Sequence, residues 1–473
     1  MTFDAAKEVV EKNGQGHVLA FWAELTDSEQ EQLLAQIADI DFASIAQMQD
    51  KLLSGLDTDA SAVTGITPAP VLELDEVQRC APESSKLGGD ALRAGRVGVL
   101  LVAGGQGSRL GFDGPKGAYE IGPISGASLF EIHARKVLAL ERIYGAEIPL
   151  YIMTSQANDV DTRNFFVEND YFDLDPSRVL FFSQGMWPAL DEGGKLILEA
   201  PGKIFTNPDG HGGTIRALDV KGMFADMDKR GVDTLFYFQV DNPLVEVADP
   251  VFIGLHLQNK ADVSVKVCAK RDASEKIGVV ALREDHSCIV EYSELTPEQM
   301  AETGPDGRLK LLYGSVAIHV FDVGFLKKCA QRPMLLHLAH KQVPFVNAEG
   351  ETVKPEKPNA WKFEKFIFDV LPEADEVLYV AFDRALEFSP VKNAEGEDSP
   401  ATTQRDMIRK FAGWMEACGV VVERDTDGAP RYKIEIDPCY AISADELRNR
   451  LGASFRWDAD LLLVDGDADE GED

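Results

Sequence analysis

The sequence has few cysteines and no long apolar run, and each shortage excludes a class of protein. The six cysteines among 473 residues are scattered, and no C-x-x-C pair occurs, so neither a disulfide framework nor a zinc site is expected. The strongest apolar run, residues 97–103, is far too short to cross a bilayer. The first twelve residues lack the apolar core of a signal peptide. We therefore expect a cytoplasmic protein.

Basic residues are also scarce relative to acidic ones. Lys and Arg number 47, Asp and Glu number 80, and the formal net charge is −33. This balance argues against nucleic acid or an anionic membrane as the main partner, because both require a positive field. A phosphate-bearing ligand stays compatible, because a few clustered cations can reverse the field locally.

The apolar pattern predicts an α/β fold with a mostly parallel central sheet sandwiched by helices. Runs of apolar residues buried on both faces are typical of parallel strands, and here they alternate with amphipathic helical patterns. The region from residue 264 to 321 shows more strand-like alternation and should extend the sheet. The expected strands are residues 97–103, 149–153, 178–182 and 234–240, and the expected helices include residues 129–144 and 215–229.

Changes in pattern along the chain predict four consecutive parts. Residues 1–95 should form an accessory helical region, in which Thr26 and Glu29 have capping-box spacing and residues 57–70 make a loose connection. Residues 96–389 should form the main domain. Residues 390–464 should form a small β-rich domain, with strands at 420–422 and 432–436 around a D-T-D-G turn, and residues 465–473 an acidic, disordered tail.

The sharpest motif follows the first predicted strand. The letters L-V-A-G-G-Q-G-S-R-L-G occupy residues 101–111, and P-K-G occupies residues 115–117. A strand that runs into a glycine-rich turn exposes backbone N–H groups and allows a ligand to approach the main chain. Arg109 and Lys116 add two cations suited to phosphate oxygens.

Three nucleotide-binding patterns compete for this motif. A Walker A loop requires G-x-x-x-x-G-K-[ST], which does not occur. A dinucleotide fingerprint requires G-x-G-x-x-G, but Leu110 stands at the third glycine position. The pattern G-G-x-G-[ST]-R-L followed by P-K, which is the signature of sugar nucleotidyltransferases, fits without a gap.

Further motifs occur in the order of one family within that class. They are F-S-Q-G-M (182–186), P-D-G-H-G-G (208–213), Q-V-D-N-P-L (239–244), V-E-Y-S-E (290–294), K-P-N-A-W-K-F-E-K-F (357–366) and E-F-S-P-V-K-N-A (387–394). Over residues 95–395 the chain resembles the eukaryotic-type UDP-sugar pyrophosphorylases, and most closely the UDP-N-acetylglucosamine pyrophosphorylases. The resemblance implies a Rossmann-like, GT-A-like nucleotidyltransferase fold. It also implies uridylyl transfer from UTP to a sugar 1-phosphate, with release of pyrophosphate.

The implied reaction needs no nucleophile from the protein, because the sugar phosphate supplies it. Catalysis then depends on alignment and on neutralising charge at phosphorus. The resemblance assigns this role to Arg109, Lys116 and Lys392. Asp241, at the end of an apolar strand, is the candidate ligand for Mg²⁺, which favours carboxylate oxygens. From spacing alone, Asp241 could equally cap the turn that follows.

The resemblance also distributes the ligand contacts. Backbone at Gly104 and Gly105 should face uracil, with Gln184 and Gly210 at its edge. Gly278 and Glu291 match positions that meet the sugar. Lys362, expected on a helix, matches a lysine that contacts phosphate.

Two residues depart from the pattern of the acetylglucosamine enzymes. His211 stands where they carry Asn, and Ser315 stands where they carry an Asn that contacts the N-acetyl group. Specificity follows from such polar contacts, because an unpaired group penalises the wrong substrate. Glucose 1-phosphate is therefore a serious competitor of N-acetylglucosamine 1-phosphate.

Two other functions use similar glycine-rich loops or scaffolds. A non-catalytic sensor of UTP or UDP-sugar could use the same scaffold, although it need not retain all four of Arg109, Lys116, Asp241 and Lys392. The displaced third glycine of the dinucleotide fingerprint argues against a nicotinamide-dependent dehydrogenase. The oligomeric state is open, with a monomer favoured.

Overall fold

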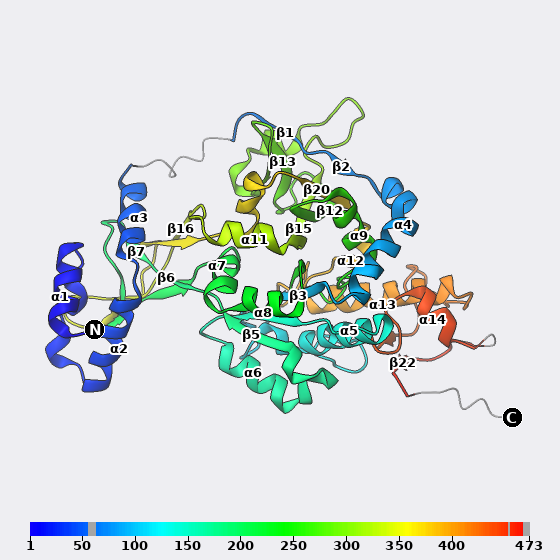
Figure 1. Cartoon of the computed structure of the whole chain (residues 1–473), viewed down its shortest axis with the longest axis horizontal. Coiled ribbons are helices and arrows are strands. Elements are labelled where there is room, and N and C mark those ends of the chain that lie inside the picture. The colour runs from blue at the N-terminus through cyan, green and yellow to red at the C-terminus, as the bar shows by residue number, and fades with distance from the viewer. Residues whose placement is uncertain (55–62, 453–454, 467–473) are drawn as a thin grey trace. The chain divides into compact units, whose positions relative to one another are not determined.

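The computed structural model describes residues 1–54, 63–452 and 455–466 (Figure 1). The chain forms two compact units. One consists of Met1–Thr64, Gln184–Thr214 and Pro333–Asp369; the other consists of Gly65–Ser183, Ile215–Arg332 and Val370–Asp473. These units join segments that are distant in sequence, and the consecutive boundaries at residues 95, 389 and 464 stay a prediction.

The larger unit is built on one mixed sheet, whose main path contains eight strands. All neighbouring pairs on this path are parallel except the two that involve the antiparallel β15. The prediction of a mostly parallel sheet is therefore confirmed. In order across the sheet, the strands are β2 (Val71–Leu72), β20 (Val377–Ala381), β12 (Val263–Ala269), β15 (Tyr313–Asp322), β11 (Thr234–Gln239), β3 (Val97–Val102), β4 (Leu150–Thr154) and β5 (Val179–Ser183).

The predicted extension of the sheet is also present. Strands β13 (Val279–Arg283) and β14 (His286–Val290) form a hairpin, and β13 pairs with β15 and with β1 (Ile66–Pro68). This extension begins next to Gly314, which lies opposite Val279. It therefore builds a wall at one end of β15.

The helices of this unit follow the apolar pattern, with one difference. Helix α5 spans Leu129–Tyr144 as predicted, with Ser128 at its N-cap and Gly145 in the left-handed conformation at its C-cap. The predicted helix at 215–229 is instead two helices, α7 (Gly213–Val220) and α8 (Met223–Arg230). Gly222, with φ of 76°, interrupts them, because a left-handed residue cannot continue an α-helix.

Helices α4 (Leu74–Arg93) and α9 (Pro250–Asn259) pack closely through two glycines. A Cβ atom on Gly88 would lie 2.0 Å from the Pro250 carbonyl oxygen, and one on Gly254 would lie 1.8 Å from that of Ser84. Glycine is therefore required at both positions. Further helices of this unit include α6 (Asp159–Glu168), α10 (Pro297–Ala301), α11 (Val323–Ala330) and α12 (Arg384–Glu387).

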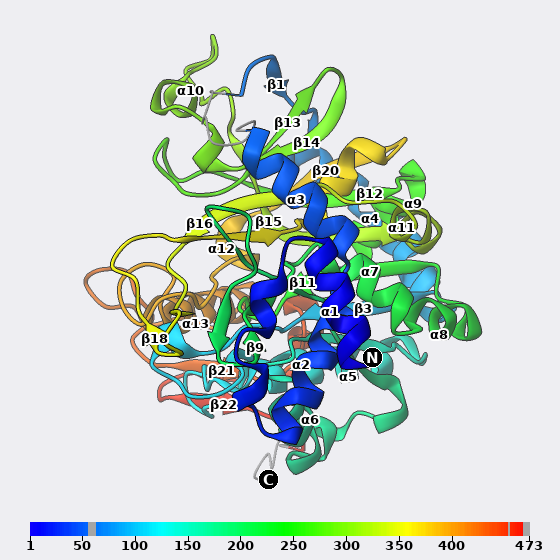
Figure 2. The same ribbon diagram turned by 90° about the vertical axis from the view of Figure 1, so that its left-hand side faces the viewer.

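The smaller unit contains the predicted N-terminal helices, drawn in dark blue in Figure 2. Thr26 and Glu29 form the predicted capping box of α2. Short strands contributed by the two later segments complete this unit. Its helices are α1 (Phe3–Lys12), α2 (Asp27–Asp39) and α3 (Phe42–Ser54), and its strands include β6 (Met186–Pro188), β7 (Leu190–Asp191), β10 (Thr206–Pro208), β16 (His337–Lys341) and β19 (Ala360–Glu364).

The expectation of a β-rich C-terminal part is wrong. Residues 390–464 contain the long helix α13 (Pro400–Ala417), the shorter α14 (Ala444–Arg450) and only two three-residue strands in the described range, β21 (Ile434–Ile436) and β22 (Leu461–Leu463). Residues 420–422 form no strand. The D-T-D-G turn is present, closed by the hydrogen bond from the Gly428 N–H to the Asp425 carbonyl.

The predicted tail and linker lie partly outside the described residues, which exclude 55–62 and 467–473. Within the described part of the tail, Asp465 pairs with Arg142 and Arg450. All six cysteines are free thiols. Among the residues that the structure describes, no helix combines the length and the apolar character needed to traverse a membrane.

Candidate active site

The glycine-rich motif forms an ordered loop at the carboxyl end of β3. The Lys116 N–H donates to the Gly105 carbonyl at 3.0 Å, and the Gly107 N–H donates to the Gly114 carbonyl at 2.9 Å. These bonds fold the P-K-G segment back against the glycines. Gly105 is exposed, and a Cβ atom built on it would have nothing within 4 Å. The main chain at this point is open to a ligand.

Asn158, which was not among the residues predicted from the sequence, holds this loop through two of its backbone carbonyls. Its buried side-chain amide donates to the Ala103 carbonyl at 2.8 Å and to the Gly105 carbonyl at 3.2 Å. Its Oδ1 atom accepts the Ser155 N–H at 2.8 Å, which fixes the orientation of the amide. No local sequence pattern reveals this contact, since Asn158 and Ala103 are 55 residues apart.

Asp241 lies beside the same loop. Because β3 and β11 are parallel and pair Val102 with Gln239, both strands end at one edge of the sheet. Asp241 is 8% exposed, and its Oδ2 atom lies 3.6 Å from the Lys116 Nζ atom. The structure thus brings together the carboxylate and one of the cations that the sequence singled out.

Arg109 completes the loop. It lies in a single 3₁₀ turn, Ser108–Leu110, which ends at Gly111 in the left-handed conformation with φ of 70°. Its side chain is exposed, and none of the hydrogen bonds or ion pairs found among the described residues involves it. The guanidinium is therefore available to an anionic ligand.

A second loop brings Lys392 towards Asp241. The Val391 N–H donates to the Asp241 carbonyl at 2.8 Å, so the residue next to Lys392 is bound to the backbone of the carboxylate residue. The Lys392 N–H in turn donates to the Asp398 carbonyl at 2.7 Å. The Lys392 Nζ atom lies 5.6 Å from the centre of the Phe388 ring.

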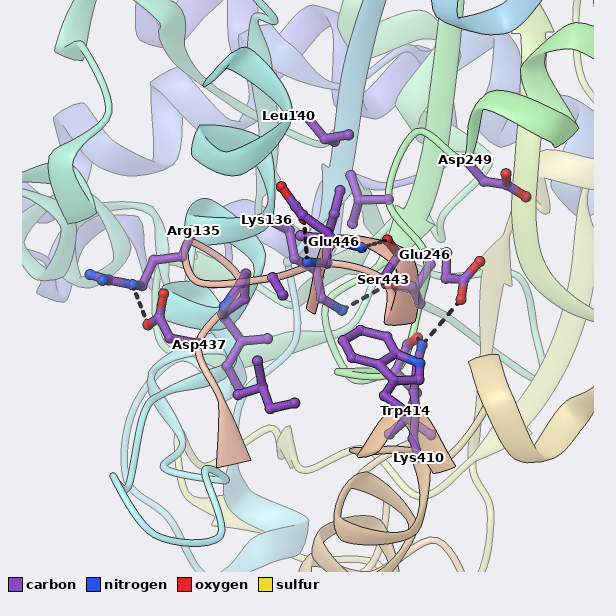
Figure 3. A pocket seen from close by; sticks show the side chains of 18 of the residues that line it. Arg135, Lys136, Leu140, Glu246, Asp249, Lys410, Trp414, Asp437, Ser443 and Glu446 are labelled. Carbon is purple, nitrogen blue, oxygen red and sulfur yellow. Dashed lines mark hydrogen bonds and ion pairs between the residues drawn. The ribbon is translucent and has the colours of Figure 1, made fainter. Parts of the chain in front are cut away.

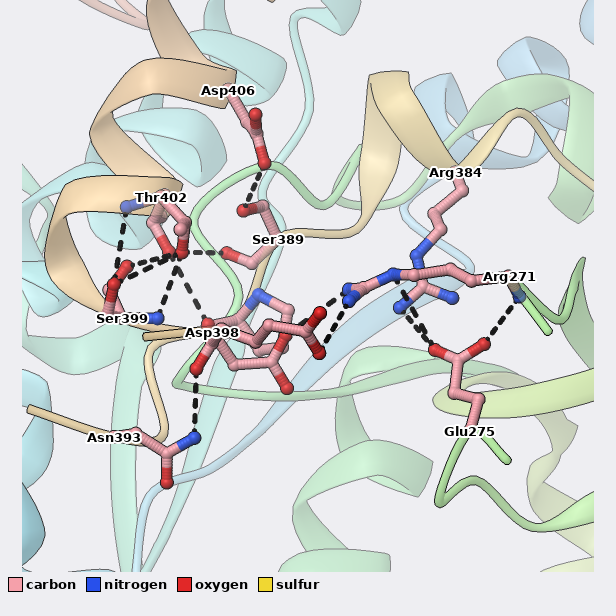
Figure 4. Close-up of polar contacts among 12 residues, drawn as sticks. Arg271, Glu275, Arg384, Ser389, Asn393, Asp398, Ser399, Thr402 and Asp406 are labelled. Atoms are coloured by element: carbon pink, nitrogen blue, oxygen red, sulfur yellow. Dashed lines mark hydrogen bonds and ion pairs between the residues drawn. The ribbon is translucent and has the colours of Figure 1, made fainter. Parts of the chain in front are cut away.

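One arginine, Arg271, ties this loop to the segment that follows β12 (Figure 4). Arg271 pairs with Glu397 at 3.1 Å and with Asp398 at 3.4 Å. Glu275 accepts from Arg384 at 2.7 Å and also lies 3.8 Å from Arg271. The loop that carries Lys392 is therefore held at its far end by charged pairs.

The three residues expected to meet the sugar lie together at the sheet extension. The Ser315 N–H donates to the Gly278 carbonyl at 2.9 Å. A Cβ atom on Gly278 would lie 2.9 Å from the Glu291 Oε1 atom, so these two residues are in contact. Since β15 runs antiparallel to β11, with His319 opposite Tyr237, Ser315 lies towards the edge at which β11 ends.

The predicted residues Gln184, Gly210 and His211 belong to the smaller unit. Gln184 is buried. Gly210 has φ of 83°, and a Cβ atom there would lie 2.4 Å from the Lys365 carbonyl oxygen, so glycine is required. The Gly212 N–H donates to that same carbonyl at 2.8 Å.

His211 is anchored through one ring nitrogen. Its Nδ1 atom accepts the Ile367 N–H at 3.0 Å, and its ring stacks on Phe366 with centroids 5.4 Å apart. Burial lowers the pKa of His211 to about 4. The imidazole is therefore neutral near pH 7, with its proton on Nε2 as a donor.

Lys362 does not lie on a helix, which corrects the prediction. It lies on β19, which pairs antiparallel with β16 and β7. Its Nζ atom lies 5.0 Å from the centre of the Phe205 ring, and burial lowers its pKa.

The donor groups near the glycine loop fit Mg²⁺. A single nearly buried carboxylate, Asp241, fits an ion that takes one or two protein carboxylates and completes its shell with phosphates and water. A separate group of three carboxylates, Glu246, Asp249 and Glu387, is already paired with lysines, because Lys266 Nζ lies 2.9 Å from Asp249 and 2.6 Å from Glu387, and Lys410 Nζ lies 3.4 Å from Glu246. That second group is an internal ion network.

Known proteins are similar in sequence to this chain over most of its length. UDP-N-acetylglucosamine pyrophosphorylase of Saccharomyces cerevisiae is 35% identical over 88% of this chain and 92% of its own length. The human UDP-N-acetylhexosamine pyrophosphorylase-like protein 1 is 36% identical over 87% of this chain and 85% of its own.

Solved structures agree with these relatives. UDP-N-acetylglucosamine pyrophosphorylase from Trypanosoma brucei, solved with an inhibitor, has a TM-score of 0.80 at 27% identity and covers 94% of both chains. UDP-glucose pyrophosphorylases of Leishmania major share the fold at about 15% identity, with TM-scores near 0.60. A family model described as UTP–glucose-1-phosphate uridylyltransferase matches residues 50–398. By this match and by the extent of its relatives, the chain belongs to the UTP–glucose-1-phosphate uridylyltransferase family.

Proposed function

We propose that this protein is a uridylyltransferase that forms a UDP-sugar and pyrophosphate from UTP and a hexose 1-phosphate. The observation that carries the proposal is the convergence of the open glycine loop, Lys116 and Asp241 at one edge of the sheet, with the 3.6 Å Lys116–Asp241 contact. Membership of a uridylyltransferase family supports it.

In the proposed reaction, a phosphate oxygen of the sugar 1-phosphate attacks the α-phosphorus of UTP. The bond from that phosphorus to the oxygen bridging to the β-phosphate breaks, and pyrophosphate leaves with the bonding electrons. Arg109 and Lys116 would hold the triphosphate, and Lys392 would neutralise charge that develops at the α-phosphorus. The exposed guanidinium of Arg109 and the open backbone at Gly105 suit these roles.

Asp241 would hold a Mg²⁺ ion beside the triphosphate. Until the ion binds, Lys116 would neutralise the negative charge of the Asp241 carboxylate. When bound, the ion would supply charge neutralisation at the phosphate oxygens. The remaining work falls to residues of the chain. Gly104 and Gly105 would offer backbone to uracil, and Gln184 and Gly210 would contact its edge.

The sugar would meet Gly278, Glu291 and Ser315, and Lys362 would meet a phosphate group. Relatives that are named for UDP-N-acetylglucosamine favour N-acetylglucosamine 1-phosphate as the acceptor. Ser315 favours glucose 1-phosphate, because the serine hydroxyl is shorter than an amide and replaces two donors with one.

The deciding experiment is pyrophosphate release by the purified protein with UTP and MgCl₂. The panel contains the 1-phosphates of glucose, galactose, N-acetylglucosamine and N-acetylgalactosamine, each with and without EDTA. We expect release that EDTA abolishes, with the ranking of sugars identifying the acceptor. Binding of UTP without release for any sugar would contradict the proposal and favour a binding protein.

A further inference from the structure

The turn that follows Asp241 is tied to the loop that carries Lys392 through one buried side chain. Asn242 is 5% exposed, and its Nδ2 group donates to the Glu387 carbonyl at 2.7 Å. Its Oδ1 atom accepts the Ser389 N–H at 3.1 Å. Together with the backbone bond from Val391 to Asp241, these contacts join the two loops at three points.

Glu387, whose carbonyl Asn242 holds, is itself fixed by a buried ion pair. The Lys266 Nζ atom is bonded to both carboxylate oxygens of Glu387, at 2.6 and 2.8 Å, and to Asp249 at 2.9 Å. Lys266 is 2% exposed and Glu387 is 7% exposed. A buried pair of this kind has little freedom to move, since separating the charges would leave each one unpaired.

The chain beyond Asn242 is held by two further lysines that border a cavity of about 550 Å³ (Figure 3). Lys136 from α5 donates to the Pro243 and Val245 carbonyls at 2.5 and 2.7 Å. Lys410 from α13 donates to the Leu244 carbonyl at 3.1 Å. The backbone that follows Asn242 is therefore also fixed by side chains from α5 and α13.

Helix α13 holds the Lys392 loop from the other direction. The Thr403 hydroxyl, which is fully buried, donates to the Ser389 carbonyl at 3.1 Å. The Ser389 hydroxyl donates to Asp406 at 2.9 Å, as Figure 4 shows. The contacts described for residues 387–391 therefore come from β12, from α13 and from the turn formed by Asp241 and Asn242.

From these contacts we propose that Asn242 is a positioning residue, which fixes the loop of Lys392 relative to Asp241 so that both act on the same phosphate group. The inference rests on the proposed uridylyltransfer. Asn242 offers two donors and an acceptor in one planar group, and here it donates to the Glu387 carbonyl and accepts from the Ser389 N–H, both in the segment that leads to Lys392. It acts through its neighbours, and alignment errors of about 1 Å can cost about 100-fold in rate.

The first test compares kcat and KM of Asn242→Ala with those of the wild-type protein. We expect kcat to fall by about tenfold or more, with less than about a threefold change in either KM, because binding groups remain while their alignment is lost. Asn259→Ala is the matched control, since the Asn259 amide also donates to a backbone carbonyl of the same unit, at 2.8 Å, but at the end of α9. It should leave kcat unchanged.

The second test is a double variant with Lys392→Ala. If Asn242 acts by placing Lys392, then Asn242→Ala should lower kcat by less than about threefold in that background, because coupled residues are not additive. A purely structural asparagine would give the same factor in both backgrounds. Thr403→Val, an isosteric change that removes the Ser389 anchor, should show a smaller loss of kcat with the same dependence on Lys392, and it covers the case in which Asn242→Ala does not fold.

The outcomes separate this inference from the proposed function. An active wild-type protein in which Asn242→Ala and Thr403→Val keep full kcat, or in which their effects multiply with that of Lys392→Ala, overturns the positioning role alone. A folded wild-type protein with no turnover for any sugar overturns the proposed function and this inference together.

Discussion

The carboxylate of Asp241 is the single group on which the proposed reaction depends most directly. It is nearly buried, it ends a buried strand, and its nearest cation is Lys116 at 3.6 Å. Replacing it with Asn keeps the shape of the side chain and removes the charge that would hold Mg²⁺.

We expect Asp241→Asn to lower kcat by about 10²- to 10³-fold, the size seen when one electrostatic group of an active site is removed. Pyrophosphate release across a MgCl₂ titration measures this change. Asp233→Asn is the control, because Asp233 pairs with Arg96 at the exposed surface and should leave kcat unaltered. A kcat for Asp241→Asn within threefold of wild type would refute the metal assignment.

Ser315 offers a test of sugar choice at the same scale. Its backbone is fixed by Gly278, so a longer side chain would start from a defined point. We expect Ser315→Asn to raise the ratio of kcat/KM for N-acetylglucosamine 1-phosphate to that for glucose 1-phosphate by about three- to tenfold, the worth of one hydrogen bond.

The measurement is a pair of steady-state assays with the two sugars, run on Ser315→Asn and on the surface variant Ser177→Asn. Ser177 is exposed on the same unit and should leave the ratio unchanged. If the ratio for Ser315→Asn equals that of the wild type, position 315 does not read the sugar.

At the scale of elements, the glycine loop depends on a helix that follows the next strand. Asn158 is the N-cap residue of α6, and from there its amide reaches the carbonyls of Ala103 and Gly105. The first of these contacts is buried, and removing the donor would leave the Ala103 carbonyl unpaired.

We expect Asn158→Ala to raise KM for UTP by about tenfold, because a loop without its anchor must be ordered by the ligand. Asn169, the C-cap residue of the same helix, makes an exposed bond to the Phe165 carbonyl at 2.8 Å and supplies a matched control. Asn169→Ala should leave KM for UTP unchanged. Equal KM values for the two variants would show that the loop orders itself.

At the scale of the whole molecule, buried neutral histidines make stability depend on pH. His256 is 3% exposed and contacts the Ser264 hydroxyl at 2.9 Å, and burial lowers its pKa to about 4. The unfolded chain binds its proton near the ordinary pKa of 6.5, so this contribution is present above pH 6.5 and is lost as pH falls towards 4.

We expect the free energy of unfolding to fall by roughly 2 kcal/mol between pH 7 and pH 5 because of His256 alone. The net charge of −33 becomes less negative as the pH falls, which reduces repulsion between like charges. The contribution of His256 must therefore be separated from this effect by comparison with a variant that lacks the histidine. Urea unfolding of wild type and His256→Gln at both pH values measures the difference. Parallel pH profiles for the two proteins would contradict this account.

The molecule also shows which features local sequence can predict. Buried apolar runs gave β3, β4, β5 and β11 within one or two residues, because a strand covered on both faces needs little else. The prediction of a β-rich C-terminal part was wrong. Ser399 and Pro400 form a favourable helix start, and residues 400–417 are a helix, whereas the short apolar runs beyond it form only short strands. The prediction of a helix at Lys362 was wrong because a short aromatic-rich segment is compatible with the period of a helix and with that of a strand.

Residue type and spacing within a few positions were sufficient to predict the central sheet, the glycine loop and the charged groups beside it. The side chains that hold these features in place could be identified only in the folded chain. Asn158 reaches Ala103 across 55 residues, and Asn242 reaches Glu387 across 145. Such contacts leave no periodic or local pattern, because the partners become neighbours only when the parallel strands bring their carboxyl ends to one edge.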